Sequence, residues 1–266
     1  MFTLEGTTLG HYHLERRIAC GGMSEIYLAN DEHTQRKVAI KAVDRHDNEF
    51  VKRFQCELKA LALLKHEHIL PTFDSGEERS WCYFVMPYIE YGTLRERLAK
   101  GPLDIEEAGI ILEQVASALQ YAHDHGILHR DIKPSNILLR NEQHVYLADF
   151  GLAKEVNDSD ALTQTEELIG TPEYIAPELA EGPGSASSDI YALGIVLYQM
   201  LTGRVPFKAR TPIAVCWKHI LEQPMQPSLL NPAISYPVEQ VILRALEKEP
   251  QRRFQTVREM AQAYRE

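Results

Sequence analysis

Four side chains in two short motifs have the types that phosphoryl transfer needs. Asp131, Lys133 and Asn136 lie in the segment HRDIKPSN, and Asp149 begins the tripeptide DFG thirteen residues after Asn136. A transferring phosphoryl group carries negative charge on its outer oxygens, so a protein contributes mainly positioning, cations and a carboxylate that takes the acceptor's proton. Asp131 can be that carboxylate and Lys133 can reach the phosphate, while Asn136 and Asp149 offer the oxygen ligands that Mg²⁺ prefers. The two motifs therefore predict an ATP-using site.

Together with several other segments, the two motifs resemble those of the eukaryotic-type protein kinase domain. The segments VAIK (38–41), GTPEY (170–174) and APE (176–178) stand in the family's order around HRDIKPSN and DFG. Segments such as GGMSEIYLA and MPYIEYGTL are most similar to bacterial members, the Hanks-type serine/threonine kinases. The resemblance covers about residues 9–264 and implies one protein kinase domain over residues 1–266, with an α+β, bilobed protein kinase-like fold.

The resemblance also implies how the elements are ordered along the chain. It predicts a β-rich N-lobe over residues 1–88 with one main helix, a hinge over 89–93 and a mostly helical C-lobe over 94–266. The apolar pattern agrees, because residues 12–18 alternate as in a strand, whereas residues 50–65 and 104–125 have helical spacing. Helix starts are predicted at Asp104, with Glu107 as its capping partner, at Thr211 before a proline, and at Thr256 three residues before Glu259.

As a member of this family, the chain would be a non-specific serine/threonine protein kinase that transfers the γ-phosphate of ATP to protein hydroxyls. The resemblance implies that Lys41 binds the α- and β-phosphates and pairs with Glu57, and that Asp131 and Lys133 act at the acceptor. It further implies that Asn136 and Asp149 hold Mg²⁺, with Mn²⁺ as an alternative. Thr171 would position the acceptor, and together with Lys133 it favours Ser or Thr over Tyr.

The nucleotide site implied by the family departs from its pattern in one place. The segment 18–26 should read as the glycine-rich loop GxGxxGxV, but only Gly21 matches, because Ala19 and Ser24 replace the first and third glycines. The missing glycines keep open the alternative of an ATP-binding pseudokinase scaffold, whereas the full set of catalytic residues favours an enzyme. The residues expected to contact ATP are Ile18, Ala19, Cys20, Gly21, Gly22, Met23, Ser24, Ile26, Ala39, Lys41, Met86, Pro87, Ile89 and Leu138.

Two threonines between DFG and APE are candidates for regulation. A phosphate on Thr163 or Thr165 would add a charge of about −1.5 to −2, and Arg130 is a cation that could pair with it. We therefore expect activation by phosphorylation, including autophosphorylation, as in signal transduction. In the scaffold, Asp189 is expected to be a buried structural acid in a helix over 187–203, and Arg253 is expected to pair with Glu178.

Composition excludes several classes of function. The formal charge is −10, with 28 Lys and Arg against 38 Asp and Glu, so the chain lacks the basic field that binds nucleic acid. The longest apolar stretch, residues 190–201, is too short to span a bilayer. Two His-x-His pairs, His66 with His68 and His123 with His125, lack the HExxH motif of a metal hydrolase.

The expected partners are proteins with Ser or Thr acceptors and, transiently, a second kinase domain, with no membrane contact from this segment. Four widely spaced cysteines fit reduced thiols and a cytoplasmic location, either alone or as the cytoplasmic domain of a membrane-anchored kinase.

Overall fold

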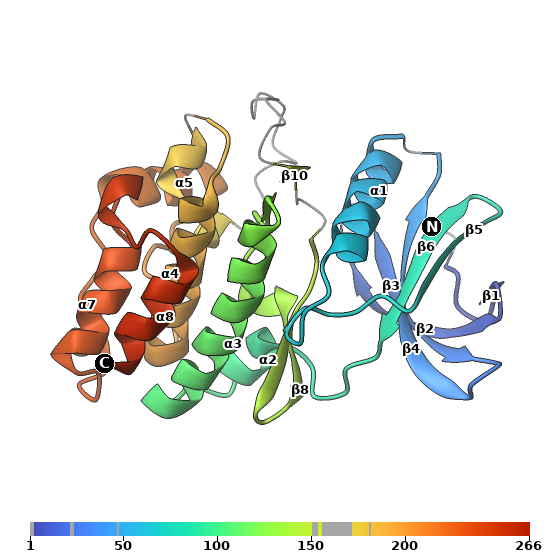
Figure 1. The fold of residues 1–266 in the computed structure, drawn as a ribbon, viewed down its shortest axis with the longest axis horizontal. Coiled ribbons are helices and arrows are strands. Elements are labelled where there is room, and N and C mark those ends of the chain that lie inside the picture. Colours follow the sequence, from blue (N-terminus) through green and yellow to red (C-terminus); the bar gives the residue numbers. More distant parts are fainter. Residues whose placement is uncertain (1–2, 22–23, 47, 151–153, 156–171, 181) are drawn as a thin grey trace. The chain divides into compact units, whose positions relative to one another are not determined.

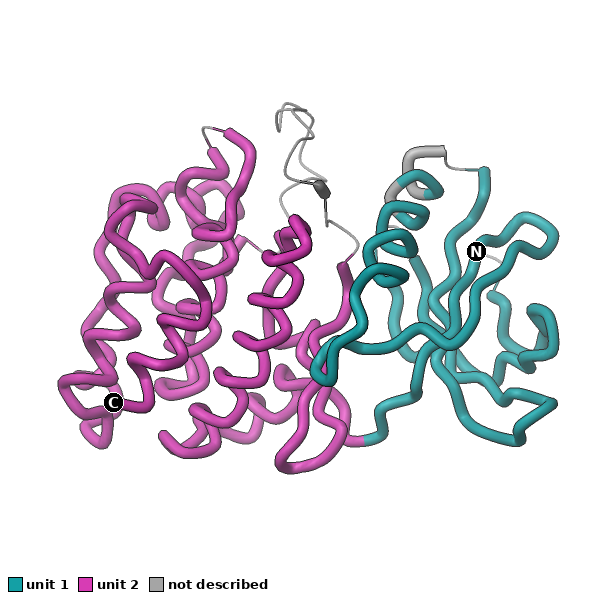
Figure 2. The backbone as a smooth tube through the Cα atoms, in the orientation of Figure 1, with its two compact units in different colours: residues 1–90 teal, residues 91–266 magenta. Residues whose placement is uncertain are grey.

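The computed structural model describes residues 3–21, 24–46, 48–150, 154–155, 172–180 and 182–266. The chain forms two compact units, residues 1–90 and 91–266 (Figure 2). Unit 1 is rich in β-strands and carries one long helix, whereas unit 2 is mostly helical (Figure 1). The predicted α+β fold is therefore confirmed.

The described part of unit 1 contains an antiparallel sheet of six strands in the order β1-β2-β3-β4-β6-β5. Its centre is β4, which has strands on both edges and whose residues 38–43 are all buried. One face packs into an apolar core that includes Leu14, Tyr27, Ile40 and Val85. The strands are β1 (Thr8–Leu9), β2 (Tyr12–Cys20), β3 (Glu25–Asp31), β4 (Arg36–Asp44), β5 (Asp74–Glu78) and β6 (Trp81–Pro87).

The strand β2 departs from the simple alternation that the sequence predicts. Tyr12 and Leu14 are buried as expected, but Arg16 and Arg17 are both exposed. The pairing of β2 with β3 shifts register between Leu14 and Arg16 and again between Arg17 and Ala19. A bulge inserts an extra residue and so breaks the period of two on which the alternation rests.

Helix α1 (Asn48–Leu63) lies against β4 and β6 of this sheet. Phe54 is buried, and its ring centroid lies 5.3 Å from that of Phe84 on β6. The predicted helix over 50–65 is wrong by two residues at each end. At the C-terminal end the chain turns at His66, whose ring nitrogen Nδ1 accepts a hydrogen bond from the backbone N–H of His68, and this local bond competes with further helix.

Unit 2 is built around helices α3 (Ile105–Asp124) and α4 (Ala186–Thr202). Helix α4 is buried almost all round, which explains the uninterrupted apolar stretch in its sequence. Around them lie α2 (Leu94–Leu98), α5 (Pro212–Leu221), α6 (Pro227–Leu230), α7 (Tyr236–Ala245) and α8 (Val257–Arg265). Short strands add a β8–β9 hairpin (Ile137–Asn141, His144–Leu147) and a pair between β7 (Ile127–Leu128) and β10 (Lys154–Glu155). The 3₁₀ turns are η1 (Pro134–Asn136), η3 (Pro172–Tyr174), η4 (Pro177–Ala180) and η5 (Pro250–Arg252).

The helix caps predicted from the sequence are confirmed. The side chains of Asp104, Thr211 and Thr256 accept backbone N–H bonds at the starts of α3, α5 and α8. The pair of Asp104 and Glu107 is one-sided, because Glu107 donates its N–H to Asp104 but its carboxylate binds Arg97 on α2. Glu107 thus takes part in the cap of α3 and also links α3 to α2.

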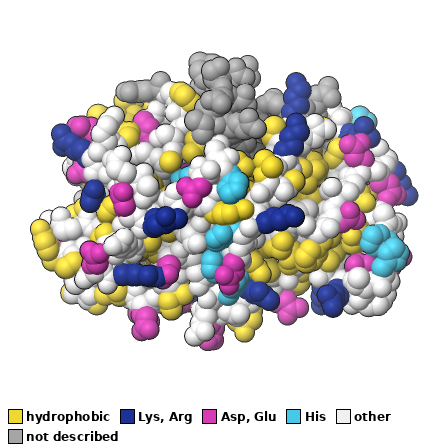
Figure 3. Space-filling view, viewed as in Figure 1, with side chains coloured by type: hydrophobic (Ala, Val, Ile, Leu, Met, Phe, Trp, Pro, Cys, Tyr) yellow, Lys and Arg dark blue, Asp and Glu magenta, His cyan; other side chains and the backbone are white. Residues whose placement is uncertain are grey.

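Two further expectations concern the chain as a whole. Within the described ranges, the helices are all too short or too polar to cross a membrane. The four cysteines are free thiols. On the face drawn in Figure 3, basic and acidic side chains are interspersed, in keeping with the absence of a basic excess in the composition.

Candidate active site

In unit 1, the predicted pair of Lys41 and Glu57 forms. Lys41 lies on the central strand β4 and Glu57 lies on α1. The two residues are only 8% and 2% exposed. The Lys41 ammonium donates to both carboxylate oxygens, at 2.9 Å and 2.7 Å. Both groups are nearly buried, and in this pair each charge compensates the other. The pair fixes a cation on one face of the sheet.

Three of the apolar residues predicted to contact ATP share that face. Ile26 pairs with Lys41 across the β3–β4 ladder, and Ala39, two residues before Lys41, pairs with Met86 on β6. Residues directly opposite in neighbouring strands point to the same side, as do residues two apart along a strand. Ala39 and Met86 are buried, whereas Pro87 and Ile89 are half-buried. Ile26, Ala39 and Met86 therefore lie on the same side of the sheet as Lys41, whereas Pro87 pairs with Val38 and lies on the other side.

The β2–β3 hairpin occupies the place of the glycine-rich loop. Ala19 pairs with Ile26 and Cys20 with Glu25, and Gly21 N–H donates to the Ser24 carbonyl at 2.8 Å. Within the part of the chain that the structure describes, a Cβ built on Gly21 would meet that carbonyl oxygen at 3.6 Å, which is ordinary contact. Ala19 lies in ordinary strand conformation, so the replacement of a glycine there causes no backbone strain. Gly22 and Met23 lie outside the described residues.

In unit 2, the segment from His129 to Asp131 is held by the buried acid Asp189 at the start of α4. The backbone N–H groups of His129 and Arg130 donate to the two Asp189 carboxylate oxygens, each at 2.9 Å. His123 on α3 donates from Nε2 to the same carboxylate at 2.7 Å. Burial by itself raises the pKa of Asp189, but these hydrogen bonds and the charge of His123 outweigh it and lower the pKa. Asp189 is thus a structural acid that holds the backbone of His129 and Arg130 directly.

Asp131 is surrounded by donors from the residues predicted to act with it. Lys133 Nζ lies 2.6 Å from Asp131 Oδ2, and Asn136 Nδ2 donates to the Asp131 carbonyl at 2.8 Å and to Oδ2 at 3.1 Å. A carbonyl only accepts, so the atom that faces it must be the amide nitrogen of Asn136. That assignment leaves the Asn136 oxygen Oδ1 for other partners, and Ser135 Oγ approaches it at 3.4 Å. An oxygen in this position suits a metal ligand.

The segment around Asp149 is joined to the same place by backbone contacts. Ala148 N–H donates to the Asn136 carbonyl at 2.9 Å, and the Ala148 carbonyl accepts from His129 Nε2 at 3.1 Å. Phe150 is fully buried, with its ring centroid 4.6 Å from that of His129. Asn136 and Asp149 therefore lie in adjoining segments, and their carboxamide and carboxylate oxygens form the hard donor set that fits Mg²⁺.

Two of these residues have an unusual backbone. Arg130 and Asp149 adopt left-handed φ angles of 63° and 66°. Such angles are uncommon for residues other than glycine, and they concentrate at functional sites where the surroundings hold them. Here the bond from the Arg130 N–H to Asp189, and the bond from the N–H of Ala148, which precedes Asp149, to the Asn136 carbonyl, contribute to that restraint.

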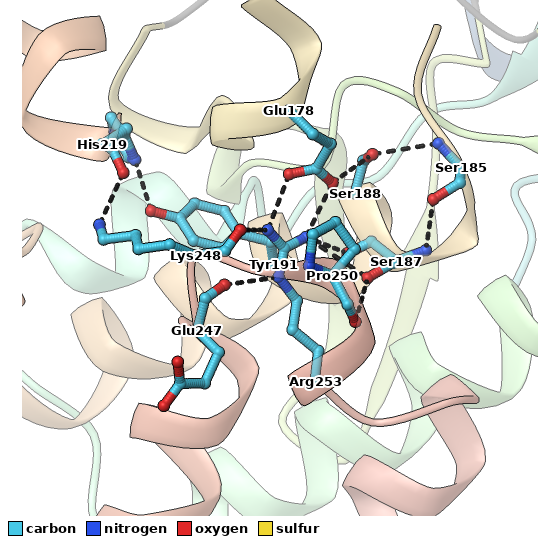
Figure 4. A network of polar contacts seen from close by, with 10 residues as sticks. All are labelled: Glu178, Ser185, Ser187, Ser188, Tyr191, His219, Glu247, Lys248, Pro250 and Arg253. Carbon is cyan, nitrogen blue, oxygen red and sulfur yellow. Dashed lines mark hydrogen bonds and ion pairs between the residues drawn. The ribbon is translucent and has the colours of Figure 1, made fainter. Parts of the chain in front are cut away.

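The predicted scaffold pair of Glu178 and Arg253 also forms (Figure 4). Arg253 is fully buried, and its NH1 and NH2 donate to the two Glu178 oxygens at 2.8 Å and 2.7 Å. Its remaining donors meet the carbonyls of Ser187, Glu247 and Lys248. Burial alone raises the pKa of Glu178, but the hydrogen bonds and charge of Arg253 outweigh it and lower the pKa. The pair ties η4 to the turn before α8.

The same region contains contacts that the sequence gave no reason to expect. Tyr191 and His219 share a hydrogen bond of 2.8 Å, and Lys248 donates to the His219 carbonyl at 2.6 Å (Figure 4). Burial, followed by the nearby charge of Lys248, lowers the pKa of His219 to about 4. No motif marks these residues, because each comes from a different helix or turn.

Several predicted residues lie outside the described ones, namely Thr163, Thr165, Thr171 and Gly151. Among the described residues, one other cluster has metal-binding side chains, formed by His11, Asp31 and His33. The two imidazole rings are stacked at 4.0 Å with 10° between their planes, so their nitrogen lone pairs lie in parallel planes and do not converge on one ion. The Asp31 carboxylate is already occupied by the β3–β4 turn, where it accepts from Thr34.

Residues 12–264 match the family model described as the protein kinase domain. The chain belongs to the protein kinase domain family. It is 41% identical over 256 residues to the serine/threonine-protein kinase PrkC of Bacillus subtilis, covering 94% of this chain and 39% of that protein. It is 39% identical over 258 residues to the serine/threonine-protein kinase PknB of Mycobacterium leprae, covering 94% and 42%. It is also 42% identical over 264 residues to the probable serine/threonine-protein kinase PknB of Corynebacterium glutamicum, covering 94% and 41%.

The chain thus spans about two fifths of the length of these curated relatives. The predicted resemblance to bacterial Hanks-type kinases is confirmed. Protein kinases in general use ATP with a divalent metal ion. The catalytic and binding roles of individual residues stay predictions.

Proposed function

We propose that the chain is a serine/threonine protein kinase that transfers the γ-phosphate of ATP to hydroxyl groups of proteins, with Mg²⁺ as the metal. The observation that carries the proposal is the arrangement around Asp131 in unit 2. Its carboxylate lies against Lys133 and Asn136, while Asn136 and the segment of Asp149 are joined through Ala148. Such an arrangement combines a proton acceptor, a cation and two oxygen ligands.

Each residue has a role in this mechanism that follows from its contacts. Asp131 accepts the proton of the acceptor hydroxyl as the hydroxyl oxygen attacks the γ-phosphorus, while the bond from that phosphorus to the β-phosphate oxygen breaks and ADP leaves. Lys133, bonded to Asp131 Oδ2, stabilises the charge on the phosphoryl oxygens. Asn136 Oδ1 and the Asp149 carboxylate would hold Mg²⁺, which when bound supplies further positive charge to the phosphates. Lys41, held by Glu57, binds the α- and β-phosphates.

Among the described residues of the β2–β3 hairpin, which leave out 22 and 23, nothing favours the pseudokinase alternative. Ala19 and Cys20 pair normally with β3, and a Cβ on Gly21 would make only ordinary contact with the described atoms around it. Small residues at 19, 21 and 24 allow a phosphate to approach the backbone. The hairpin can therefore serve the same purpose as one with more glycines.

The choice of Ser and Thr as acceptors rests on the relatives, which are named serine/threonine-protein kinases, and on Lys133 in the catalytic segment. To test it, the chain is incubated with γ-labelled ATP and three peptides that differ only in a Ser, Thr or Tyr acceptor. We expect label on the Ser and Thr peptides. Label on the Tyr peptide alone would overturn the assignment.

We also propose activation by phosphorylation of Thr163 or Thr165, with Arg130 as the pairing cation, and transient pairing of two kinase domains for this step. Mass mapping of ATP-treated protein beside an Asp131→Asn control tests the phosphorylation, because phosphate on neither threonine in active enzyme would contradict the proposal.

The free thiols and the use of ATP support a cytoplasmic location, either of this chain alone or as the cytoplasmic domain of a membrane-anchored kinase.

A further inference from the structure

A groove of about 560 Å³ lies in unit 2 between α2, α3 and the β8–β9 hairpin. Its floor is apolar and includes Ile110, Ile111, Leu139 and Val145, with the exposed ring of Tyr91 at one side. The hairpin separates this groove from the catalytic segments, because Asn136 immediately precedes β8 whereas the groove reaches residues 141–143 at the turn. A strand rises about 3.3 Å per residue, so the turn lies about 16 Å along the hairpin from Asn136.

Hydrogen bonds hold the three walls of the groove together. Arg97 on α2 makes a two-pronged ion pair with Glu107 on α3, at 3.0 Å and 2.8 Å. The Gln114 side chain on α3 clamps the hairpin, donating to the Gln143 carbonyl at 2.7 Å and accepting from Val145 N–H at 2.8 Å. Leu139 N–H donates to the Gly92 carbonyl at 2.9 Å, which ties β8 to the segment before α2. Figure 1 shows these elements side by side, and their links indicate a preformed groove.

The polar side chains around the floor are mainly acidic. Five carboxylates line the groove, from Glu96, Asp104, Glu106, Glu107 and Glu142, against the two cations Arg97 and Lys100. Glu107 already compensates Arg97.

Four carboxylates therefore face a single further cation, Lys100. Asp104 and Glu96 accept backbone N–H groups at the starts of α3 and α2, which leaves their negative charge in place. Glu106 on α3 and Glu142 in the hairpin turn are exposed on two different walls. An apolar floor thus lies between negatively charged walls.

We propose that this groove docks a basic, extended segment of a protein substrate, one that carries Lys or Arg on both sides of an apolar side chain. The proposal rests on the proposed kinase function, because it concerns how that enzyme selects its substrates. Charge complementarity selects this occupant, since a segment with acidic or no charged residues would gain nothing from the walls. A second copy of this chain, with its formal charge of −10, is the less suitable partner.

Docking outside the catalytic segments acts through effective concentration. A substrate held in the groove by one segment presents its acceptor hydroxyl at millimolar local concentration when the intervening chain can span the distance. A flexible linker of about ten residues has a root-mean-square length of about 17 Å, close to the separation along the hairpin. Docking of this kind lowers KM and leaves kcat unchanged, because it adds binding that is equal in ground and transition states.

A binding measurement tests the groove itself. The probe is a fluorescein-labelled peptide of twelve residues with three arginines flanking two leucines and with no Ser, Thr or Tyr, and its anisotropy is followed on addition of the chain. In the groove variant, Glu106→Lys with Glu142→Lys, we expect Kd to rise at least tenfold. The matched control, Glu222→Lys with Glu249→Lys, changes the net charge equally outside the groove and should shift Kd less than threefold.

Two further arms separate groove binding from general attraction. Tyr91→Ala removes an exposed apolar ring without touching the core and should weaken binding threefold or more. The same peptide with Glu in place of Arg should not bind. Equal loss in the groove variant and its control, or no loss in either, would overturn the proposal. Thermal midpoints within 2 °C of wild type show that the variants remain folded.

A kinetic measurement distinguishes failure of the docking proposal from failure of the proposed function. Two substrate peptides share one Ser acceptor, and one of them carries the basic segment through a ten-residue Gly-Ser linker. We expect a KM at least tenfold lower for the extended peptide, an unchanged kcat, and loss of the difference in the groove variant. Equal KM values with both peptides phosphorylated would overturn docking alone. Phosphorylation of neither peptide, with binding retained, would overturn the kinase function and leave the groove.

Discussion

Replacement of Arg253 by Met should lower the stability of unit 2 by about 4 kcal/mol. The substitution keeps an extended side chain but removes the cation of the two-pronged pair with the Glu178 carboxylate, together with the hydrogen bonds that Arg253 donates to three backbone carbonyls. Breaking a buried ion pair on one side typically costs about 3–5 kcal/mol, because the remaining charge stays buried without compensation. The cation also lies 4.7 Å from the centroid of the Tyr191 ring, and that contact is lost as well.

The effect should be measured as a free energy of unfolding in urea, with the thermal midpoint as a second observable. For a domain of 150–250 residues, each kcal/mol shifts the midpoint by about 2–4 °C, so the expected fall is about 8–16 °C. If the slope of the free energy of unfolding against urea concentration is the same in both proteins, the comparison is between the same folded and unfolded states.

The neighbouring residue offers a matched control. Arg252 makes an ion pair with Glu249 at 3.0 Å, but their side chains are 64% and 62% exposed, so Arg252→Met should change stability very little. Adding Glu178→Gln to Arg253→Met removes the uncompensated charge and should recover part of the loss. A change below about 1 kcal/mol in Arg253→Met, or strictly additive losses in the double variant, would refute the reasoning.

Three other perturbations have defined outcomes. Since the pKa of His219 is lowered to about 4, the unfolded chain binds a proton on this residue between pH 6.5 and 4 that the folded chain does not, so the stability of the folded chain should fall by about 3 kcal/mol over that range. In urea unfolding at pH 7 and pH 4.5, His219→Gln should lack this fall, and equal falls in variant and wild type would contradict the assignment. Glu57→Gln should slow phosphate transfer at least tenfold, because Lys41 loses the carboxylate that holds it, while the exposed Glu67→Gln should not; equal rates would contradict the role of the pair. Asp189→Asn should speed hydrogen exchange of the His129 amide and slow transfer, because an amide group cannot accept all three hydrogen bonds, and unchanged protection would count against it.

The parts of the structure that could be predicted from sequence are those whose signals are local. Caps at Asp104, Thr211 and Thr256 were predictable because a cap needs only a side chain and a backbone N–H a few residues apart. The pairing of Lys41 with Glu57 was predictable from the resemblance to the kinase family. The double register shift in β2 could not be found in this way, because a bulge depends on how the partner strand pairs.

The restraints around the site have no such local signal. Asp189 accepts from residues about 60 positions away, and its role in positioning the backbone of His129 and Arg130 depends on how α4 packs. Left-handed angles at Arg130 and Asp149 leave no mark in residue type, since neither position is a glycine. The clamp of Gln114 on the hairpin likewise requires α3 and β9 to be neighbours. Sequence thus predicted the reacting groups, whereas the groups that hold them required the fold.

The most direct test of the account is a paired measurement of ATP binding and γ-phosphate transfer, with Mg²⁺ and a protein substrate containing Ser and Thr, on the wild-type chain and on Asp131→Asn. Asp131 contacts Lys133 and Asn136, so its amide variant should keep ATP binding within a few fold. The account predicts transfer by the wild type and a rate at least a hundredfold lower in the variant, because the proton acceptor is lost. Clear ATP binding without transfer by the wild type, or equal transfer by both proteins, would contradict it.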